Sequence, residues 1–346
     1  MSKKNSSAIL KNSFEDYKEL SNIYLDFEKK LNHLKKKIFL VAVSGGPDSL
    51  ALTALSKSYN YNNKAKFYYV LVDHNLRKNS STEALLVKKL LKNHKIALRV
   101  LRNKKDIKKN IQGEAREIRY DLLTKFCKKN NINVILTAHN LEDQVETFFI
   151  RLSRGSGLQG LSSMKQLSKI QNNIILARPL LDLKKIQLTK ISKLIFGQFF
   201  KDPTNKNLKY LRTRVRTLKK SLEKIGIKYD QIFKSIKNLA SSRDTLNLYF
   251  NEIYKKIVNK NKSKILINVK SLNELNQEMK INVIKKSIKE ISKSYYSPRS
   301  RKIINLIKRL EMPYKTKATL GGCLIIKQQN HIILQKENKN KQFIKI

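Results

Sequence analysis

A run of small and polar residues near the start of the chain has the composition of a phosphate-binding loop. It follows an apolar, β-branched segment at 38–43 and precedes a helical pattern that begins near Leu50. Its members are Ser44, Gly45, Gly46, Pro47, Asp48 and Ser49. Glycines let the backbone approach a phosphate, and the start of a helix presents free N–H groups. Asp48 is compatible with phosphates when a cation lies between them, so the run predicts a nucleotide with Mg²⁺.

The spacing of this run differs from that of two other phosphate-binding loops. It has neither the Gly-Lys-Ser/Thr ending of a Walker A loop nor the Gly-x-Gly-x-x-Gly spacing of a dinucleotide-binding loop. An ordinary turn that begins a helix is the plainer interpretation of two adjacent glycines. The full run of six residues between a predicted strand and a predicted helix favours the phosphate-binding interpretation.

A second polar cluster follows another apolar segment, at 134–138. His139 comes directly after that segment, and Asn140 can cap a helix that starts at residue 141. Asp143 and Glu146 are three residues apart, so both carboxylates should project from one face near the helix N-terminus. Two carboxylates near a phosphate site would repel the phosphates unless a cation lay between them. That cation could be a metal or a substrate ammonium. Alternatively, the two acids are solvated surface residues and do not bind a substrate. His139 is either a structural histidine or a residue that contacts the reacting groups or transfers a proton.

Basic residues in two further segments could contact phosphate. Arg116 and Arg119 share one face of a predicted helix and could clamp a phosphate, with Arg119 the candidate for the charge that develops at an α-phosphate. Arg212 and Arg214 belong to an alternating run at 212–216, for which we predict ATP or RNA contact. Surface salt bridges and a solvated charge run are the alternatives.

Strands that alternate with helices are expected to position these clusters. Apolar segments at 38–43, 67–72, 96–101 and 134–138 predict buried strands, and helical patterns at 81–92, 111–129 and 141–153 lie between or after them. This order predicts an α/β fold with a parallel sheet. The clusters at 44–49, 73–74 and 139–146 each follow a strand, and ligands bind at the carboxyl ends of strands in such sheets. We therefore expect one site, with Asp73 among its residues.

The chain divides into three parts by pattern. Residues 1–37 predict an N-terminal helical extension, and 38–218 carry all the strand-end clusters. Residues 219–346 are lysine-rich and poor in glycine and proline, which predicts a mostly helical second domain that binds RNA. Segments at 323–326 and 331–334 predict a small hairpin at its end.

Composition indicates an anionic partner. The 346 residues include 74 Lys and Arg against 26 Asp and Glu, a formal net charge of +48. Such an excess favours nucleic acid, although codon bias toward lysine accounts for part of it. No apolar run approaches the roughly 20 residues of a spanning helix, so no membrane contact is expected. The two cysteines exclude a disulfide framework and a four-cysteine zinc site, and the absence of a signal-like segment predicts a cytoplasmic protein.

The loop at 44–49 resembles the PP-loop of the ATP pyrophosphatases, which cleave ATP between its α and β phosphates. Further blocks resemble the tRNA(Ile)-lysidine synthases over about residues 38–218, although Glu114 stands where that pattern more often has a small residue. Those blocks are residues 72–77, 113–120 and 137–147, Arg151, Arg154, Gly155, Gly157, Gly160, Leu161, residues 178–181 and 202–205, and Tyr210, Arg212, Arg214 and Arg216.

The resemblance implies an adenine nucleotide alpha hydrolase-like fold and a two-step ligation. ATP with Mg²⁺ would adenylate the C2 oxygen of cytidine 34 in tRNA(Ile) with a CAU anticodon, releasing pyrophosphate. Free L-lysine would then displace AMP to give lysidine, which changes codon reading from AUG to AUA. It also implies that the loop and Asp73 bind ATP and that Asp143 and Glu146 recognise lysine. The roles of Asp48 toward the metal and of Arg116 and Arg119 toward phosphate are those expected above from the residues.

Other functions stay open at this point. A PP-loop tRNA thiolase would share the loop but usually needs reactive cysteines, and only Cys127 and Cys323 are present. An amidotransferase-type synthetase would need an ammonia source. A non-enzymatic basic RNA-binding protein would explain the charge but not the strand-end clusters. A homodimer and the identity of the general base are also left open.

Overall fold

The computed structural model describes most of the chain as two compact units, residues 1–240 and 241–346. The described residues are 18–76, 79–105, 107, 111–170, 173–200, 207–261, 263–293, 298–312 and 314–337. The first 17 residues of the predicted N-terminal extension, Arg77 and the block at 202–205 therefore lie outside the described residues. Each unit is treated by itself below.

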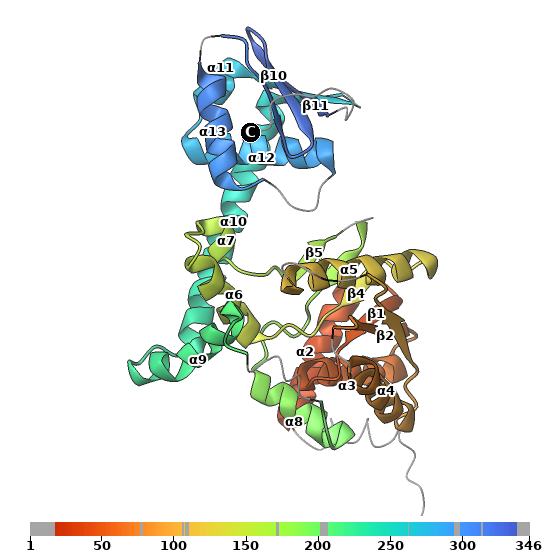
Figure 1. Cartoon of the computed structure of the whole chain (residues 1–346). Coiled ribbons are helices and arrows are strands. Elements are labelled where there is room, and N and C mark those ends of the chain that lie inside the picture. Colours follow the sequence, from red (N-terminus) through yellow and green to blue (C-terminus); the bar gives the residue numbers. More distant parts are fainter. Residues whose placement is uncertain are drawn as a thin grey trace, which may run out of the picture. The chain divides into compact units, whose positions relative to one another are not determined.

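The first unit is built around a six-stranded sheet with the order β3-β2-β1-β4-β6-β5 (Figure 1). All neighbouring pairs are parallel except β5 with β6. The strands are β1 (Ile38–Val43), β2 (Lys66–Asp73), β3 (Leu98–Arg102), β4 (Val134–Leu136), β5 (Leu167–Lys169) and β6 (Ile175–Ala177). The predicted α/β fold and its four strands are confirmed, and β5 and β6 extend the sheet beyond them.

Helices cover both faces of this sheet, as Figure 1 shows. Side chains alternate along β1: Phe39 and Val41 pack with α3 and α8, whereas Leu40 packs with Leu123 and Cys127 of α5 on the other face. This alternation is the two-residue period of a strand buried on both sides. The helices are α2 (Lys18–His33), α3 (Pro47–Asn62), α4 (Ser80–Asn93), α5 (Ile111–Lys129), α6 (Leu141–Leu152), α7 (Leu158–Leu161) and α8 (Lys185–Phe196).

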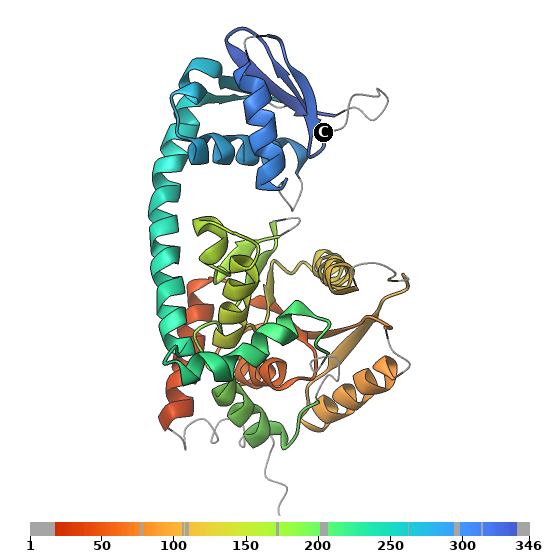
Figure 2. The ribbon, with the colours of Figure 1, turned by 60° about the vertical axis from the view of Figure 1, so that its left-hand side comes forward.

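A separate apolar cluster joins α6 to the helices that follow the sheet. These are α9 (Leu211–Lys224) and α10 (Tyr229–Ile257). Leu141 and Val145 of α6 pack against Tyr229, Ile232 and Phe233 at the start of α10. The first unit therefore extends past residue 218, and the division between the two units, at residues 240 and 241, falls within the sequence of α10, which can be followed in Figure 2.

The second unit contains a five-stranded antiparallel sheet with the order β7-β8-β11-β10-β9. Its strands are β7 (Val258–Lys260), β8 (Lys264–Asn268), β9 (Lys317–Leu320), β10 (Cys323–Lys327) and β11 (His331–Lys336), and its helices are α11 (Val269–Asn273), α12 (Gln277–Ser292) and α13 (Ser300–Glu311). The predicted hairpin is β10–β11. This hairpin lies in a larger sheet than the sequence indicated, because β8 pairs with β11 on the side away from β10.

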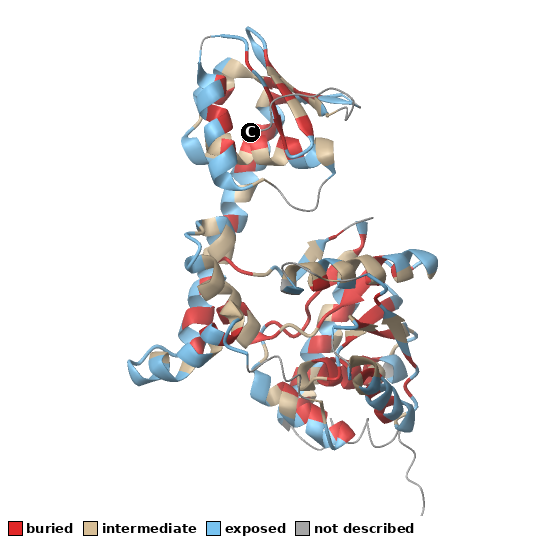
Figure 3. Ribbon diagram, in the orientation of Figure 1, coloured by how far each residue is buried: buried red, intermediate tan, exposed pale blue. Residues whose placement is uncertain are grey.

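Each unit buries its own apolar core, coloured red in Figure 3. In the second unit, Ile284 and Ile288 of α12 and Leu306 of α13 pack on Ile325 of the sheet. Among the helices in the described part of the chain, none combines the length and apolarity that a membrane span requires.

Candidate active site

The loop after β1 has the backbone of a phosphate cradle. Gly45 adopts a φ of +80°, and a Cβ there would lie 2.5 Å from a Val87 methyl group, so only glycine fits. The Ser49 hydroxyl accepts from the Ser44 N–H at 3.1 Å and donates to the Gly46 carbonyl at 3.0 Å. Pro47 begins α3, and Gly46 brings no capping side chain. The first N–H groups of α3 are therefore left for an anion.

Asp48 lies in the first turn of α3, beside this cradle. Burial raises the pKa of its carboxyl to about 6, and the negative charges of Asp143 and Glu142 add to that effect. Lys185 and the side chain of Asn140 act in the opposite direction. The Asp48 Oδ1 atom is buried and has no hydrogen-bond partner among the described residues. A buried, unpartnered carboxylate oxygen next to a phosphate cradle fits a divalent cation.

The metal-ligating residues present also fit this kind of ion. Within the described ranges, no three His, Cys, Asp or Glu side chains come together as a metal site. Mg²⁺ does not require such a cluster, because it is usually held by one or two carboxylates together with waters and substrate phosphates. Asp48 is therefore a suitable protein ligand for Mg²⁺ that arrives with ATP.

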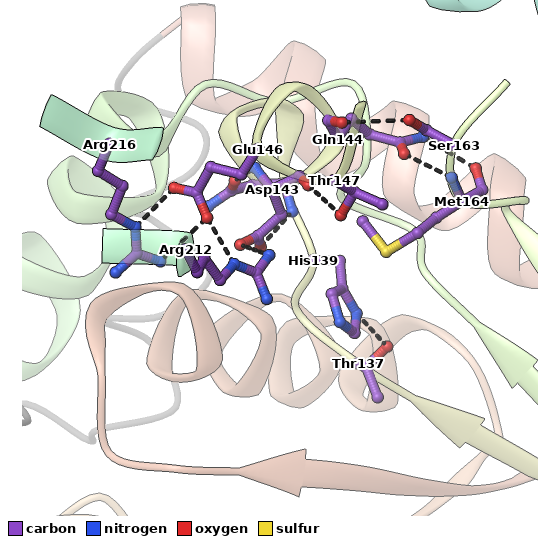
Figure 4. A network of polar contacts seen from close by, with 11 residues as sticks. Thr137, His139, Asp143, Gln144, Glu146, Thr147, Ser163, Met164, Arg212 and Arg216 are labelled. Carbon is purple, nitrogen blue, oxygen red and sulfur yellow. Dashed lines mark hydrogen bonds and ion pairs between the residues drawn. The ribbon is translucent and has the colours of Figure 1, made fainter. Parts of the chain in front are cut away.

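The acids of α6 form an ion-pair network with arginines of α9 (Figure 4). Glu146 accepts from Arg212 Nε and from Arg216 Nε, both at 2.6 Å, and Asp143 Oδ1 accepts from Arg212 Nη2 at 2.8 Å. The Glu146 side chain is 5% exposed and that of Asp143 18%. Both acids do project from one helix face, as their spacing predicts, but arginines already occupy that face.

Helical spacing decides which arginines reach the acids. Residues 211–224 form α9, so Arg212 and Arg216 are one turn apart and share a face. Arg214 lies between them on the opposite side and is exposed. The structure therefore brings Arg212 but not Arg214 to the acids, and it adds Arg216. Arg216 belongs to the run for which ATP or RNA contact was predicted, and its pairing with Glu146 was not foreseen.

A capping box fixes the start of α6. The Asn140 side chain accepts from the Asp143 N–H at 2.9 Å, and the Asp143 Oδ2 atom accepts from the Asn140 N–H at 3.2 Å. The predicted cap is confirmed. Because Asp143 uses one oxygen in the cap and the other for Arg212, its carboxylate is held in one orientation.

His139 follows β4 and faces this network in Figure 4. Its Nδ1 atom lies 2.9 Å from the Thr137 hydroxyl. Burial, and then the positive charges of Arg178, Arg116, Arg212 and Arg119, hold the pKa of His139 well below its usual range. The imidazole is therefore neutral near pH 7, and the four surrounding guanidinium groups favour an anion beside it. The sequence did not single out Arg178 as a site residue.

We expect the His139 imidazole to show no titration between about pH 5.5 and 8. Both burial and neighbouring positive charge disfavour the imidazolium, so its proton should not bind in this range. NMR chemical shifts of the imidazole, assigned with a His139→Gln variant, measure this directly. A midpoint near the ordinary value of 6.5 would contradict the electrostatic environment described above.

The predicted phosphate clamp on α5 is oriented by a second histidine. Arg119 Nε donates to His74 Nε2 at 3.3 Å. Burial, together with the charge of Arg119, lowers the pKa of His74 to about 4, so His74 is a neutral acceptor. Arg116 instead lies with its guanidinium 5.0 Å from the Tyr120 ring centroid. The role of His74 was missed because it depends on a residue 45 positions away.

Asp73 ends β2 and is held by internal hydrogen bonds. Its Oδ1 accepts from the Asn75 N–H at 2.9 Å and its Oδ2 from the Ser81 hydroxyl at 2.8 Å. Although burial opposes the shift, these bonds hold the pKa of Asp73 below its usual value. This carboxylate joins the strand end to the start of α4. If Asp73 contacts ATP as predicted, its carboxylate must do so while it keeps the hydrogen bonds to Asn75 and Ser81.

Comparisons with known proteins give consistent matches. The model of the PP-loop domain family matches residues 19–222. A tRNA(Ile)-lysidine synthase of Wolbachia pipientis wMel is 34% identical over 88% of this chain and 72% of its own length. The enzyme of the same name from Wolbachia sp. subsp. Brugia malayi is 31% identical over 95% of this chain and 77% of its own length. The tRNA(Ile)-lysidine synthase of Orientia tsutsugamushi is 40% identical over 58% of this chain and 46% of its own length.

A solved structure shares the fold. A U34-tRNA thiolase from Methanococcus maripaludis, determined with its [4Fe-4S] cluster, superposes with a TM-score of 0.54. The superposition covers 64% of this chain and 78% of that one, at 16% sequence identity. At this identity the likeness concerns the fold alone.

Proposed function

The chain belongs to the tRNA(Ile)-lysidine synthases of the PP-loop family, and on that premise we propose that its active site lies at the carboxyl ends of β1 and β4. The enzyme is an ATP-dependent ligase. It joins lysine to C2 of cytidine 34 of tRNA(Ile) through an adenylated tRNA, and it releases AMP and pyrophosphate. We further propose that the tRNA carries a CAU anticodon and that the enzyme acts in the cytoplasm.

One observation carries the assignment of the site. The phosphate cradle follows β1, the His139 and acid cluster follows β4, and these two strands are neighbours in the sheet. The strands β2 and β4 lie on opposite sides of β1, so the strand order reverses there. Ligands of open α/β sheets bind at such a reversal of strand order.

For the first step, the loop and the surrounding arginines bind and orient ATP. The N–H groups at the start of α3 would hold phosphate oxygens, and Asp48 would hold Mg²⁺, which supplies charge neutralisation when bound. Arg119 and Arg116 would contact the α-phosphate, where negative charge develops as the cytidine oxygen attacks. His139 is neutral and so would contact the reacting groups as a hydrogen-bonding partner without adding charge.

For the second step, Asp143 and Glu146 would bind the α-ammonium of lysine. Arg212 bridges both acids, and an ammonium beside its guanidinium would be repelled. We therefore propose that lysine takes the position of Arg212 between Asp143 and Glu146, while Arg216 stays on Glu146. The displaced guanidinium is then available for the α-carboxylate of lysine. The ε-amine would be directed at C2 and must lose a proton before it attacks.

The cysteines give no support to the alternative of sulfur transfer. Cys127 and Cys323 are the chain's two cysteines, and both are buried. Burial raises the pKa of Cys127 to about 12 and that of Cys323 to about 11. The nucleophile and metal ligand in such chemistry is the thiolate. Neither side chain is therefore suited to carry sulfur or to hold a cluster.

The products test this function. The protein is incubated with ATP and a tRNA(Ile) transcript, with and without labelled lysine. Pyrophosphate release should require the tRNA, and incorporation of lysine should accompany AMP release. A transcript with the anticodon cytidine replaced is the matched control. Lysine-independent transfer of another group to the tRNA, or no tRNA-dependent pyrophosphate, would refute the assignment.

We expect the affinity for tRNA to fall steeply with salt. If the net charge of +48 serves phosphate binding, six or more phosphates contacted imply roughly a thousandfold weaker binding or worse at 200 mM than at 50 mM salt. Filter binding or fluorescence anisotropy across that range gives the slope. A flat response would mean that the charge reflects amino-acid usage and not RNA binding.

A further inference from the structure

A cavity of about 460 Å³ opens on the second unit, where the end of α10 meets α12. Its lining comes from α10, β7 and α12, and consists of Asn251, Tyr254, Lys255, Val258, Lys260 and Lys286. The α10 residues recur at helical spacing, so they form one stripe. Three of the six lining residues are lysines and none is acidic. We call this cavity the α10–α12 pocket.

Lys286 is fixed in position at this pocket. Its ammonium donates to Asn251 Oδ1 at 2.7 Å and lies 4.1 Å from the Tyr254 ring centroid. Both partners are neutral, so they orient the charge without cancelling it. Burial, opposed by Glu290, and the neighbouring Lys260 and Lys255 lower the pKa of Lys286. This position therefore holds an ammonium that gains from a nearby anion.

The other charged groups at the pocket leave a positive excess. Lys260 lies 5.1 Å from the same Tyr254 ring and pairs with Glu290 at 2.6 Å. The Tyr254 hydroxyl also donates to Glu290 at 3.2 Å, so that carboxylate is directed at Lys260 and Tyr254. Lys255 is exposed. Glu290 thus acts on Lys260 and Lys286, whereas Lys260 and Lys255 both add positive charge beside Lys286. Neighbouring like charges are unfavourable until an anion joins them.

We propose that the α10–α12 pocket binds a backbone phosphodiester of the tRNA. The proposal rests on the proposed function, which makes tRNA the substrate. Phosphate oxyanions match convergent ammonium groups, and the volume leaves room for the adjoining ribose. Asn251 is exposed and supplies an amide group beside the lysines. Binding of this kind positions the tRNA and carries no sequence information.

The test removes charge from the pocket in the full-length protein. A Lys255→Gln/Lys286→Met variant keeps the aliphatic stem over the aromatic rings, and Lys264→Gln/Lys308→Gln removes two charges elsewhere in the same unit. We expect the pocket variant to bind tRNA roughly tenfold more weakly, as removal of a charge-assisted hydrogen bond predicts. The slope of its salt dependence should be shallower by about 0.7–0.9 for each phosphate that it no longer neutralises. Lysine incorporation at saturating tRNA should equal that of the wild type.

Further measurements separate the outcomes. Lys286→Arg should restore the affinity, and thermal melting verifies that the variants fold. A pocket variant that binds tRNA as the control variant does overturns the proposal while leaving the function intact. Reduced binding of ATP or pyrophosphate with unchanged tRNA affinity makes the pocket a nucleotide site and also overturns it. If the wild-type protein itself makes no lysidine, the proposed function fails instead.

Discussion

Replacing Asp48 by asparagine should abolish most of the tRNA-dependent pyrophosphate release. The carboxylate stands beside the phosphate cradle with Oδ1 buried and unpartnered in the described structure, and an amide cannot replace it as a metal-neutralising ligand. Removing one preorganised electrostatic interaction lowers the rate roughly a hundred- to a thousandfold. Binding of tRNA should change little. Asp121→Asn, which alters a carboxylate paired with Lys125 on α5, is the matched control.

The same substitution should stabilise the free protein, with a defined dependence on pH. Burial raises the pKa of Asp48 from 3.8 to about 6, so the folded protein binds this proton more tightly than the unfolded chain does. The ionised form of Asp48 therefore lowers the free energy of unfolding. This destabilisation is absent below about pH 4 and fully present above about pH 6. In Mg²⁺-free buffer, the melting temperature of Asp48→Asn should exceed that of the wild type at pH 8. At pH 4 the two melting temperatures should be equal. A destabilised variant at pH 8 would contradict the raised pKa of Asp48, and near-normal pyrophosphate release would refute its metal-binding role.

Glu146→Gln should raise the concentration of lysine required for ligation by roughly thirtyfold or more. Removing one member of a desolvated charge pair costs about 2–5 kcal/mol, and about 1.4 kcal/mol corresponds to tenfold. Adenylation, measured as pyrophosphate release without lysine, should fall less because ATP does not need this acid. Both quantities are measured on the same preparation, with Glu117→Gln on α5 as a control for the removed charge.

A second variant decides whether Glu146 binds lysine or only holds the arginines. Both Arg212 and Arg216 donate to Glu146 at 2.6 Å, so Glu146→Gln also leaves two guanidinium groups without this partner. Arg216→Gln removes an arginine while Glu146 keeps its charge and Arg212. If the acid binds lysine, Arg216→Gln should leave the lysine requirement unchanged or lower it. An equal rise in both variants would assign Glu146 to the fold.

Stability provides the check on that comparison. Breaking a buried pair costs about 3–5 kcal/mol, and the lower part of the range applies here because the Arg212 and Arg216 side chains are 33% and 32% exposed. Denaturant titration of each variant measures the destabilisation. Kinetics are then compared at a temperature where both variants are fully folded.

Local patterns were sufficient for the elements and for the loop. The β-branched run before Ser44 predicted β1, and the spacing from Asn140 to Asp143 predicted the cap of α6; both are confirmed. Such features are decided within a few residues, because side-chain period and capping depend on the backbone of one segment. The strands β5 and β6 were missed: β5 has a single apolar residue, which gives no pattern, whereas β6 is as short and as apolar as the predicted β4.

By itself, the sequence determined the α/β fold, the strand-end position of its polar clusters and the resemblance that indicates the reaction. Only the tertiary structure decided which charges meet. Arg212 lies 66 residues from Glu146 and Arg119 45 residues from His74. The packing of α9 on α6 brings the first pair together, and the placement of α5 over the sheet brings the second. Interactions of this range depend on strand order and helix packing, which no single segment encodes. For the same reason the first unit includes the start of α10, whose apolar face has its partner on α6.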